Sequence, residues 1–542
     1  MKTKIIALVL VCAFLFSACS SSAETTTTEE VTTTTETTTQ NIMTTARETT
    51  EETTTETTTE TTTMAELSAS ETIEAKLIDT GTQTFYSSDI FSDRDYETYY
   101  DETECYYITL SDSGSTSTES SVVISGSTIT ITTEGEYIIS GSLSNGQIIV
   151  ETADTDKVQL ILNGVSITNS SSACIYVSEA DKVFITTIYG TENTLNSTII
   201  ETTSTDEDAT NVDAAIFSKA DLTLNGLGSL TITSTCNGIT SKDDLRFTSG
   251  TYTVTSDMHG LEANDDLSID GGTYYITSGG GIANYTASSS SSSSSGPGGM
   301  SIFDIFSGFE DSETDDVYGK AIKCDTNIFI LDGTFYIDSL DDAIHSDSVT
   351  YIGGGTFEIE SGDDAIHANL ETSIAGGYIE IITCFEGIEG QRINILGGYI
   401  NMYCNDDGIN AAISDSSLGD SELYINIEDG VIIMDTNDEG DGLDSNGDIY
   451  ISGGQILISS TTVTTDTALD YQDYGVITGG TYVATESDSM TMQNFESDST
   501  QGSILVETSS TQTGTVKLTD SAGNVLVEIE PAKEYEAVII ST

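Results

Sequence analysis

Basic residues are scarce in this sequence, and their scarcity limits the possible partners. The 542 residues include 15 lysines and arginines against 89 aspartates and glutamates, a formal net charge of -74 at pH 7. Nucleic acids and anionic lipid surfaces, which are bound through clusters of basic side chains, are therefore not expected as partners. A charge of this size also repels itself, so the composition favours bound cations, above all calcium in an extracellular medium.

Tryptophan is absent and there are only two prolines, whereas there are 48 glycines and 25 tyrosines. Few prolines and many glycines suit short strands joined by tight turns. Without tryptophan, any aromatic platform for a sugar would have to use tyrosines, which the sequence does not place. Six cysteines beyond residue 19 form no Cys-x-x-Cys pair, so we interpret them as small buried hydrophobic residues: Cys105, Cys174, Cys236, Cys324, Cys384 and Cys404.

The N-terminus predicts export. Lys2 and Lys4 precede an apolar run at 5–16 that is too short to span a bilayer, which indicates a signal peptide over 1–18. The small residues before Cys19 resemble the bacterial lipobox, so we expect Cys19 to be lipidated and to anchor the protein outside the cell membrane. The alternative is ordinary cleavage nearby, in which Cys19 has no role.

Composition also divides the rest of the chain. Residues 19–66 consist largely of threonine and glutamate and have almost nothing to bury, which predicts a disordered linker. We expect a leader segment at 67–104, a repetitive body at 105–500 and, from the strand-like runs at 504–506 and 538–540, a C-terminal β cap at 501–542.

The body has an internal repeat of about 22 residues. A small residue followed by an aliphatic one recurs at spacings of 22, 21, 40, 22, 22, 22 and 21 residues, at Gly238, Gly260, Gly281, Ala321, Ala343, Ala365, Gly387 and Gly408. A second marker, a glycine that opens a strand-like step, follows half a period later at Gly250, Gly272, Gly333, Gly355, Gly377 and Gly398, with looser copies at Gly454 and Gly480. Two markers in phase predict a repeat architecture.

Between the markers lie short runs of β-branched and aromatic residues, such as 335–337 and 357–359, and helical periodicity is hard to find. The sequence therefore predicts an all-β fold, a parallel β-helix (a solenoid of about 22-residue coils) with a rise of roughly 4.8 Å per coil. Leucine-rich repeats share the period, but their Leu-x-x-Leu-x-Leu frame is missing.

Stacked coils would gather acidic side chains along one edge. The carboxylates that recur around the first marker are Asp341, Asp342, Asp363, Asp364, Glu386, Glu389, Asp406, Asp407, Asp441 and Asp444. Charges about 5 Å apart would cost roughly 3 kcal/mol per pair at an effective dielectric of about 20. We therefore expect Ca²⁺ between them, since calcium accepts many oxygen ligands in loose geometry. The alternative is that aspartate is merely favoured in the turns.

Strand alternation predicts a second row beside these carboxylates. Ile344 and its equivalents must face the core, which sends the next residue of each coil outward: His345, His367, Glu389, Asn410 and Asp444. This row could be a ligand face. Its two stacked histidines could indicate zinc, although the surrounding carboxylates favour calcium.

Several segments carry a resemblance to a known family. They are Glu-Gly-Glu-Tyr-Ile-Ile-Ser-Gly at 134–141, Val-Gln-Leu-Ile-Leu-Asn-Gly-Val-Ser-Ile at 158–167, Gly-Thr-Glu-Asn-Thr-Leu at 190–195, Ala-Ile-Phe-Ser-Lys-Ala-Asp-Leu at 215–222 and Asn-Gly-Ile-Thr-Ser-Lys-Asp-Asp-Leu at 237–245. Over about residues 105–490 the chain resembles the bacterial carbohydrate-binding domain with a pectate-lyase-like right-handed parallel β-helix.

The resemblance implies non-catalytic binding of cellulose or of acidic sugars such as polygalacturonate at the cell surface. It also implies calcium beside Ala343, held by Asp341, Asp342, Asp363, Asp364, Glu386, Asp406 and Asp407. A serine run at 288–295, an acidic loop through Asp311 and Asp316, and an insertion at 414–422 interrupt the coils, so the sugar contacts do not carry over.

Two other functions stay open. A calcium-dependent polysaccharide lyase would need a base beside the metal, for which Arg392, Lys320 and Lys323 are candidates. An adhesin or surface spacer without sugar specificity would also fit the linker and the acidic body. The preferred prediction is a monomer that binds plant cell-wall polysaccharide and meets the membrane only through its lipid.

Overall fold

The computed structural model describes residues 76–81, 83–199, 211–284, 319–413, 422–437, 440–460, 466–487 and 491–542. The predicted signal peptide, Cys19 and the Thr/Glu-rich linker lie outside the described residues. So do the serine run at 288–295, the acidic loop with Asp311 and Asp316, and most of the insertion after residue 413. Within the described part, no helix is long and apolar enough to cross a membrane.

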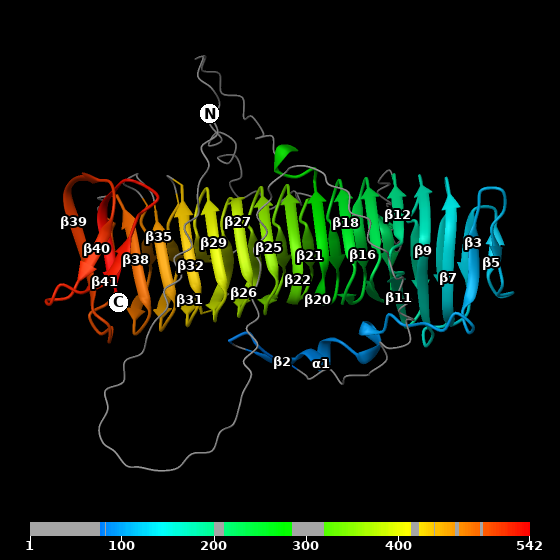
Figure 1. Ribbon diagram of the computed structural model, residues 1–542, viewed down its shortest axis with the longest axis horizontal. Helices are drawn as coiled ribbons and strands as arrows, with labels where there is room; N and C mark the ends of the chain where they lie inside the picture. Colours follow the sequence, from blue (N-terminus) through cyan, green and yellow to red (C-terminus); the bar gives the residue numbers. More distant parts are fainter. Residues whose placement is uncertain are drawn as a thin grey trace, which may run out of the picture. The chain divides into compact units, whose positions relative to one another are not determined.

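The described chain is all-β, and its parallel strands close round one axis (Figure 1). A typical coil contributes three strands, β23 (Ile344–Ser346), β24 (Val349–Ile352) and β25 (Thr356–Ser361). Each pairs in parallel with its equivalent in the coils before and after it. Three parallel faces result, which we call the first, second and third face in that order.

The first face consists of β6 (Thr128–Ile131), β8 (Gln147–Glu151), β10 (Ile175–Glu179), β13 (Ala214–Ser218), β16 (Asn237–Ser241), β19 (Leu261–Ala263), β21 (Ile322–Cys324), β23, β30 (Ile409–Ala411), β33 (Leu443–Ser445) and β36 (Leu469–Tyr471). The second face includes β11 (Lys182–Thr187), β14 (Asp221–Gly226), β17 (Leu245–Phe247), β24, β31 (Tyr424–Ile427), β34 (Asp448–Ile451) and β37 (Tyr474–Ile477). Two longer strands, β26 (Ile366–Ile374) and β28 (Ile388–Ile395), run through the corner between these two faces.

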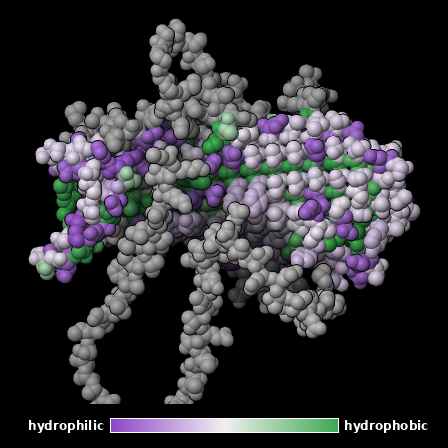
Figure 2. All heavy atoms as spheres, turned by 45° about the horizontal axis from the view of Figure 1, so that its top comes forward, coloured by the Kyte–Doolittle hydropathy of each residue, from purple (hydrophilic) through white to green (hydrophobic). Residues whose placement is uncertain are grey.

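The third face includes β12 (Glu192–Ser197), β15 (Ser229–Ser234), β18 (Thr251–Ser256), β25, β27 (Tyr378–Cys384), β29 (Tyr399–Cys404), β32 (Val431–Thr436), β35 (Gln455–Ser459) and β38 (Thr481–Glu486). Four long strands join it to the second face: β7 (Gly135–Leu143), β9 (Lys157–Asn169), β20 (Leu267–Ser278) and β22 (Asn327–Ser339). The chain enters through β3 (Tyr106–Leu110), β4 (Thr116–Ser117) and β5 (Val123–Ser125), which make antiparallel pairs. Side chains of one kind form straight rows across the strands (Figure 2).

The predicted repeat is confirmed by the strand register. Ile322, Ile344, Ile366 and Ile388 pair in succession at intervals of 22 residues, and all four are fully buried. The glycines of the second marker have positive φ angles, for example 140° at Gly333 and 103° at Gly355. A side chain would be strained there, which explains why glycine recurs at this corner.

One predicted coil marker is wrong. Gly281-Ile282 does not begin a coil, because Leu261 pairs directly with Ile322, 61 residues later. Ile282 instead lies in the short 3-10 helix η3 (Ile282–Asn284). Three consecutive glycines with positive φ angles, 279–281, end the strand before it, and the Ile282 amide donates to the Asp338 carboxylate.

The core is made of stacked identical or similar side chains. The rings of Tyr252, Tyr274, Phe335 and Phe357 stack in series with centroids 5.4, 4.8 and 4.6 Å apart. All six described cysteines are buried and free, as predicted, and Cys384 and Cys404 stack with their sulfurs 3.5 Å apart. The coils therefore interlock by direct contact along the axis.

Antiparallel strands follow the last coil. These are β39 (Ser503–Gln512), β40 (Val516–Thr519), β41 (Val525–Ile529) and β42 (Tyr535–Ser541). β42 pairs with β38, the last strand of the third face, and with β39, while β40 and β41 form a hairpin. The strand-like runs predicted at 504–506 and 538–540 lie within β39 and β42.

The leader lies along the second face (Figure 1). It comprises β1 (Leu77–Asp79), β2 (Thr84–Tyr86), α1 (Ser87–Ile90) and η2 (Asp93–Tyr96). Ile78, Ile90 and Phe91 form a buried cluster with side chains of the second face, Phe329, Leu331 and Tyr351. At one end, the Thr80 carbonyl accepts hydrogen bonds from Ser373 and Asn394. The leader thus crosses the second face from β11 to β28 and covers that part of it.

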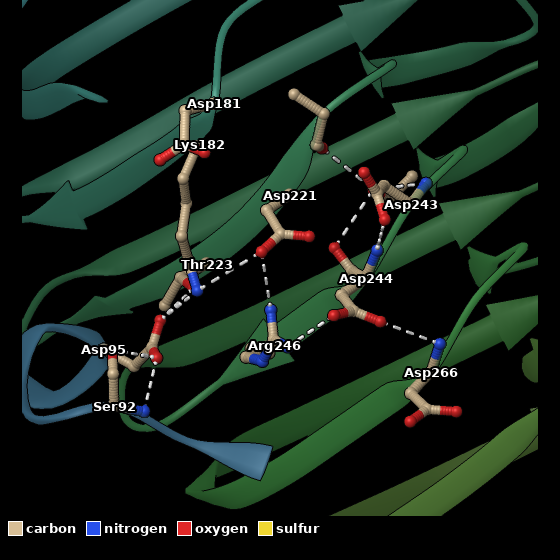
Figure 3. A network of polar contacts seen from close by, with 12 residues as sticks. Ser92, Asp95, Asp181, Lys182, Asp221, Thr223, Asp243, Asp244, Arg246 and Asp266 are labelled. Carbon is tan, nitrogen blue, oxygen red and sulfur yellow. Dashed lines mark hydrogen bonds and ion pairs between the residues drawn. The ribbon is translucent and has the colours of Figure 1, made fainter. Parts of the chain in front are cut away.

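A buried ion pair fixes the other end of the leader (Figure 3). The Asp95 carboxylate lies 2.7 Å from Lys182 Nζ and accepts a hydrogen bond from Thr223, and the side chains of Asp95 and Lys182 are 1 and 8 % exposed. Burial alone would raise the pKa of Asp95, but Lys182 and Thr223 hold it below its usual value. The pair is therefore ionised in the folded protein.

Replacing Asp95 should destabilise the body strongly. The Asp95→Ala variant leaves the buried Lys182 ammonium with only the more distant Asp221 carboxylate, at 3.9 Å, and breaking a buried pair typically costs about 3 to 5 kcal/mol. Urea unfolding measures the loss. Glu97→Ala is the matched control, because Glu97 pairs with Arg94 where both are partly exposed, and such pairs are worth less than about 1 kcal/mol. Equal losses in the two variants would contradict the prediction.

Candidate functional site

The predicted acidic edge lies at the turn between the third and first faces. Backbone hydrogen bonds set its register: the Ala343 amide donates to the Asp364 carbonyl at 2.9 Å, and the Ala365 amide to the Glu386 carbonyl at 3.0 Å. The pattern continues through Asp407 and Asp441. We call this set the acidic edge: Asp341, Asp342, Asp363, Asp364, Glu386, Asp406, Asp407 and Asp441.

The predicted outward row begins one step later on the first face. His345, His367, Glu389, Asn410 and Asp444 pair in succession across five coils. The row lies outside the hydrophobic core, but His367 and Asn410 are buried at 9 % exposure each. The expectation of a freely exposed row is wrong for these two residues, because side chains stacked one coil apart cover one another, as the rings of His345 and His367 do at 4.8 Å.

Four groups along this edge bring ligand atoms within 4.8 Å of one another. They are Asp341, Asp342 and Asp363; Asp342, His345 and His367; Asp364, His367 and Glu389; and Asp441, Asp444 and Asp470. Carboxylates predominate, which suits a hard cation such as calcium, while the two histidine groups also suit zinc.

Three predicted ligands do not join a group of three among the described residues: Glu386, Asp406 and Asp407. Glu386 accepts a hydrogen bond from the Asn410 amide at 2.9 Å, and Asp407 accepts one from the Asp441 backbone amide at 2.7 Å. Both carboxylates still lie in register on the edge and add to its charge.

Asp470 was missed by sequence reasoning. It pairs with Asp444 and completes the group at the C-terminal end of the edge. Its signal was the step Ala468-Leu469-Asp470, which repeats Gly442-Leu443-Asp444 after 26 residues. Because this coil is longer, the step does not recur at the 22-residue period.

Burial raises the pKa values of most carboxylates on the edge. Desolvation, followed by repulsion from neighbouring acids, raises the pKa of Asp363 and Glu389 well above the usual range. Burial also raises the pKa of Asp441 to about 7 and of Asp444 to about 6. Metal ions between the coils would relieve this cost, because they favour the charged form of each ligand.

An unpaired acceptor supports the fit of a cation. The side-chain oxygen of Asn410 is buried and has no hydrogen-bond partner among the described residues, although Asn410 lies in the row between Glu389 and Asp444. A buried oxygen without a donor is costly, and a cation is one partner that would satisfy it. The residues present therefore fit calcium.

Lys320 ends the edge on its N-terminal side. Its Nζ lies 2.9 Å from Asp341 and 2.6 Å from Asp342, in the coil directly before theirs. Burial alone would raise the pKa of Asp342, but the charges of Lys320 and His345 hold it well below its usual value. The protein thus supplies its own cation at this end.

The three candidate bases for a lyase are all engaged with acids. Lys320 is bound as described, Lys323 lies 3.3 Å from Asp325, and Arg392 lies 3.5 Å from the fully buried Glu371. The pKa of Lys323 is raised, because Asp325 and Glu262 outweigh the effect of burial. A lysine held in its charged form is a poor proton acceptor.

A second acidic group lies on the second face, away from the carboxylates predicted to bind metal. Asp221, Asp243 and Asp244 also bring carboxylates together, but the Arg246 guanidinium binds Asp221 at 3.2 Å and also binds Asp244 (Figure 3). Lys182 lies 3.9 Å from Asp221. Protein cations therefore balance this group, in contrast to the acidic edge beyond Lys320.

Comparison with known proteins shows which family the chain resembles. A family model described as carbohydrate-binding domain-containing protein matches residues 125–302 and 279–365. The predicted resemblance to this family is confirmed. A carbohydrate-binding domain-containing protein of Acetivibrio thermocellus is 37 % identical over 123 residues, which are 22 % of this chain and 43 % of that protein. The chain thus spans less than half the length of this relative.

A solved structure, of a polysaccharide lyase-like protein from C. thermocellum in a gadolinium derivative, is also similar. It is 26 % identical to this chain, with a TM-score of 0.39, and the match covers 51 % of this chain and 99 % of that one.

The metal-free protein should lose stability as pH rises from about 4 to about 7. Asp441 and Asp444 bind protons more tightly when folded, with pKa values of about 7 and 6, than an unfolded aspartate of about 3.9 does. The unfolded state therefore ionises first, and the free energy of unfolding falls through this window. Urea unfolding of metal-stripped protein at pH 5 and 7.5 measures the fall.

Asp441→Asn should make this fall smaller, since the variant cannot ionise at that position. Asp154→Asn serves as the control, because Asp154 is exposed in the loop after β8 and far along the coil stack. A fall of unchanged size in Asp441→Asn would show that the acidic edge does not cause it.

Proposed function

We propose that this protein binds polysaccharide without cleaving it, through a body whose acidic edge holds calcium ions. The observation that carries the proposal is the match of residues 125–365 to the carbohydrate-binding domain family. The proposed ligand is cellulose or an acidic sugar polymer such as polygalacturonate. The right-handed winding of the coils and the capping role of β39–β42 belong to the same proposal.

Calcium is favoured by the chemistry of the edge. Asp441, Asp444 and Asp470 offer oxygens at the C-terminal end, and calcium accepts six to eight such ligands. At the N-terminal end Asp363 stands with Asp341 and Asp342, where calcium would share the carboxylates with the Lys320 ammonium. The two middle groups, Asp342 with His345 and His367, and Asp364 with His367 and Glu389, include imidazole nitrogens, so they are the places where zinc would compete. When bound, calcium would neutralise the stacked carboxylates and bridge neighbouring coils.

The proposed location is the outer surface of a bacterial membrane. It rests on the predicted signal peptide, the lipidation of Cys19 and the Thr/Glu-rich linker, which would carry a monomeric body away from the lipid. Of the two rival functions, a lyase is disfavoured by the acids that engage Lys320, Lys323 and Arg392. An adhesin or spacer would bind no polysaccharide.

One experiment separates these functions. The purified full-length protein is mixed with insoluble cellulose and with polygalacturonate, each with calcium or with a chelator, and both retention and the ultraviolet absorbance of unsaturated product are followed. Retention without absorbance is the expected result. Rising absorbance that Arg392→Ala abolishes would establish a lyase, and no retention on either polysaccharide would overturn the binding proposal.

Removing calcium should lower the melting temperature, because the ion binds only the folded edge and stabilises it by mass action. At a calcium concentration about 100 times the dissociation constant, the stabilisation is about 2.7 kcal/mol per independent site. The triple variant Asp341→Asn, Asp363→Asn, Asp407→Asn should lose most of this calcium-dependent rise, while Asp154→Asn should keep it. Identical melting of the native protein in calcium and in chelator would refute structural calcium.

A further inference from the structure

Among the described residues, no segment packs over the outward side of the third face from β18 to β29, which lies beside the acidic edge. The leader packs on the second face from β11 to β28, and the row of His345 and its equivalents occupies the first face. From β18 to β29, the third face alternates buried inward residues with outward residues that are mostly threonines, tyrosines and acids. One outward row runs in register through Thr251, Thr273, Thr334, Thr356, Tyr378 and Tyr399.

Two stacked tyrosine pairs stand on this face. Tyr275 and Tyr336 stack with ring centroids 4.9 Å apart at an interplanar angle of 4°, and Tyr378 and Tyr399 stack at 4.9 Å and 1°. Tyr275, Tyr336 and Tyr378 are 44, 40 and 47 % exposed, although large aromatic side chains are usually buried. We call the outward surface of β18, β20, β22, β25, β27 and β29 the tyrosine face.

The two pairs stand on either side of β25. Tyr275 covers one side of the Tyr336 ring and Tyr399 covers one side of the Tyr378 ring, so the other side of each ring turns toward β25, where the register places Glu358 beside Tyr336 and Thr356 beside Tyr378. The residues of β25 between the two rings are Thr356 and Glu358, both exposed. Strands β22 and β27 are two strand spacings apart, roughly 9.6 Å.

Register also offsets the two rings along the strands. Tyr336 is in line with Glu380, whereas Tyr378 lies two residues earlier on β27, a shift of about 7 Å. One monosaccharide would not reach both rings. Successive units of an extended glycan that lies obliquely over β25 would reach both rings, each unit placing its C–H surface against one ring.

The charge of the tyrosine face decides between classes of glycan. Its outward strand residues include the acids Asp338, Glu358, Glu360 and Glu380, and none of the described strand residues of this face is lysine, arginine or histidine. Carboxylates accept hydrogen bonds from sugar hydroxyls, as Glu380 accepts one from the Tyr378 hydroxyl at 3.2 Å. An anionic glycan would meet only like charge here.

We propose that the tyrosine face is the polysaccharide-binding surface and that it binds a neutral glycan chain. Sugar units of the chain pack against Tyr336 and Tyr378, and the sugar hydroxyls donate hydrogen bonds to Glu358 and Glu380. The inference rests on the proposed function, since it assumes that the protein binds polysaccharide, and it adds the surface, the contacts and the class of chain. The acidic edge is then a stabilising element, and no anionic sugar binds the tyrosine face.

Four full-length variants test the assignment on microcrystalline cellulose, a neutral glucan, and on polygalacturonate. Tyr275→Ala/Tyr336→Ala and Tyr378→Ala/Tyr399→Ala should each raise the dissociation constant for cellulose at least about tenfold, which corresponds to about 1.4 kcal/mol. Tyr336→Phe/Tyr378→Phe keeps the rings and should retain most of the binding. Tyr189→Ala, in the turn after β11 and 74 % exposed, is the matched control and should bind as the native protein does.

The outcomes distinguish this inference from the function on which it rests. Native protein that binds cellulose equally well in all variants would overturn the assignment of the tyrosine face and leave polysaccharide binding intact. Native protein that binds neither polysaccharide would overturn both. Retention on polygalacturonate that is lost in the same alanine variants would overturn the neutral class. Unchanged melting temperatures would show that these surface substitutions act on binding.

Discussion

In-register stacking is the constraint on which the structure depends. Each residue of a coil lies one strand spacing, about 4.8 Å, from its equivalents in the coils on either side. A side chain must therefore tolerate its own kind as a neighbour. Isoleucine does so in the row from Ile322 to Ile388, and so do the rings of Phe335 and Phe357, because apolar contacts gain from repetition. Stacked carboxylates repel one another instead, so the acidic edge lowers the stability of the fold unless positive charge is placed beside it.

The protein meets this cost in two ways. On the second face, Lys182 and Arg246 stand among Asp95, Asp221 and Asp244, so the chain supplies the cations and ties its leader to the coils. On the acidic edge, Lys320 serves only the first coil. Beyond it burial raises the pKa values of Asp363, Glu389 and Asp441, a cost that the proposed calcium ions would relieve.

Periodicity explains what the sequence could predict. Stacking forces like residues into register, so the markers at Ala343 and Ala365 and the carboxylates beside them identified the repeat and the acidic edge. The same reasoning failed at Gly281, where an isolated Gly-Ile step imitates the marker, and at Asp470, where a longer coil hides a true copy. The packing of Phe91 on the second face depends on contacts between segments without a shared period, which no spacing reveals.

The same geometry explains why the outward side chains of the second and third faces differ in what covers them. A hydrophobic outward row has to be covered, and Phe329, Leu331 and Tyr351 of the second face are covered by Ile78, Ile90 and Phe91 of the leader. The tyrosines of the third face have no such cover among the described residues, and Tyr275, Tyr336 and Tyr378 are 44, 40 and 47 % exposed. Aromatic rings combine an apolar face with a hydroxyl at the tip, so they remain compatible with water while offering a surface for a ligand that is itself part apolar and part hydroxylated. A neutral sugar chain has this mixed character, and its repeating units match a surface that repeats once per coil.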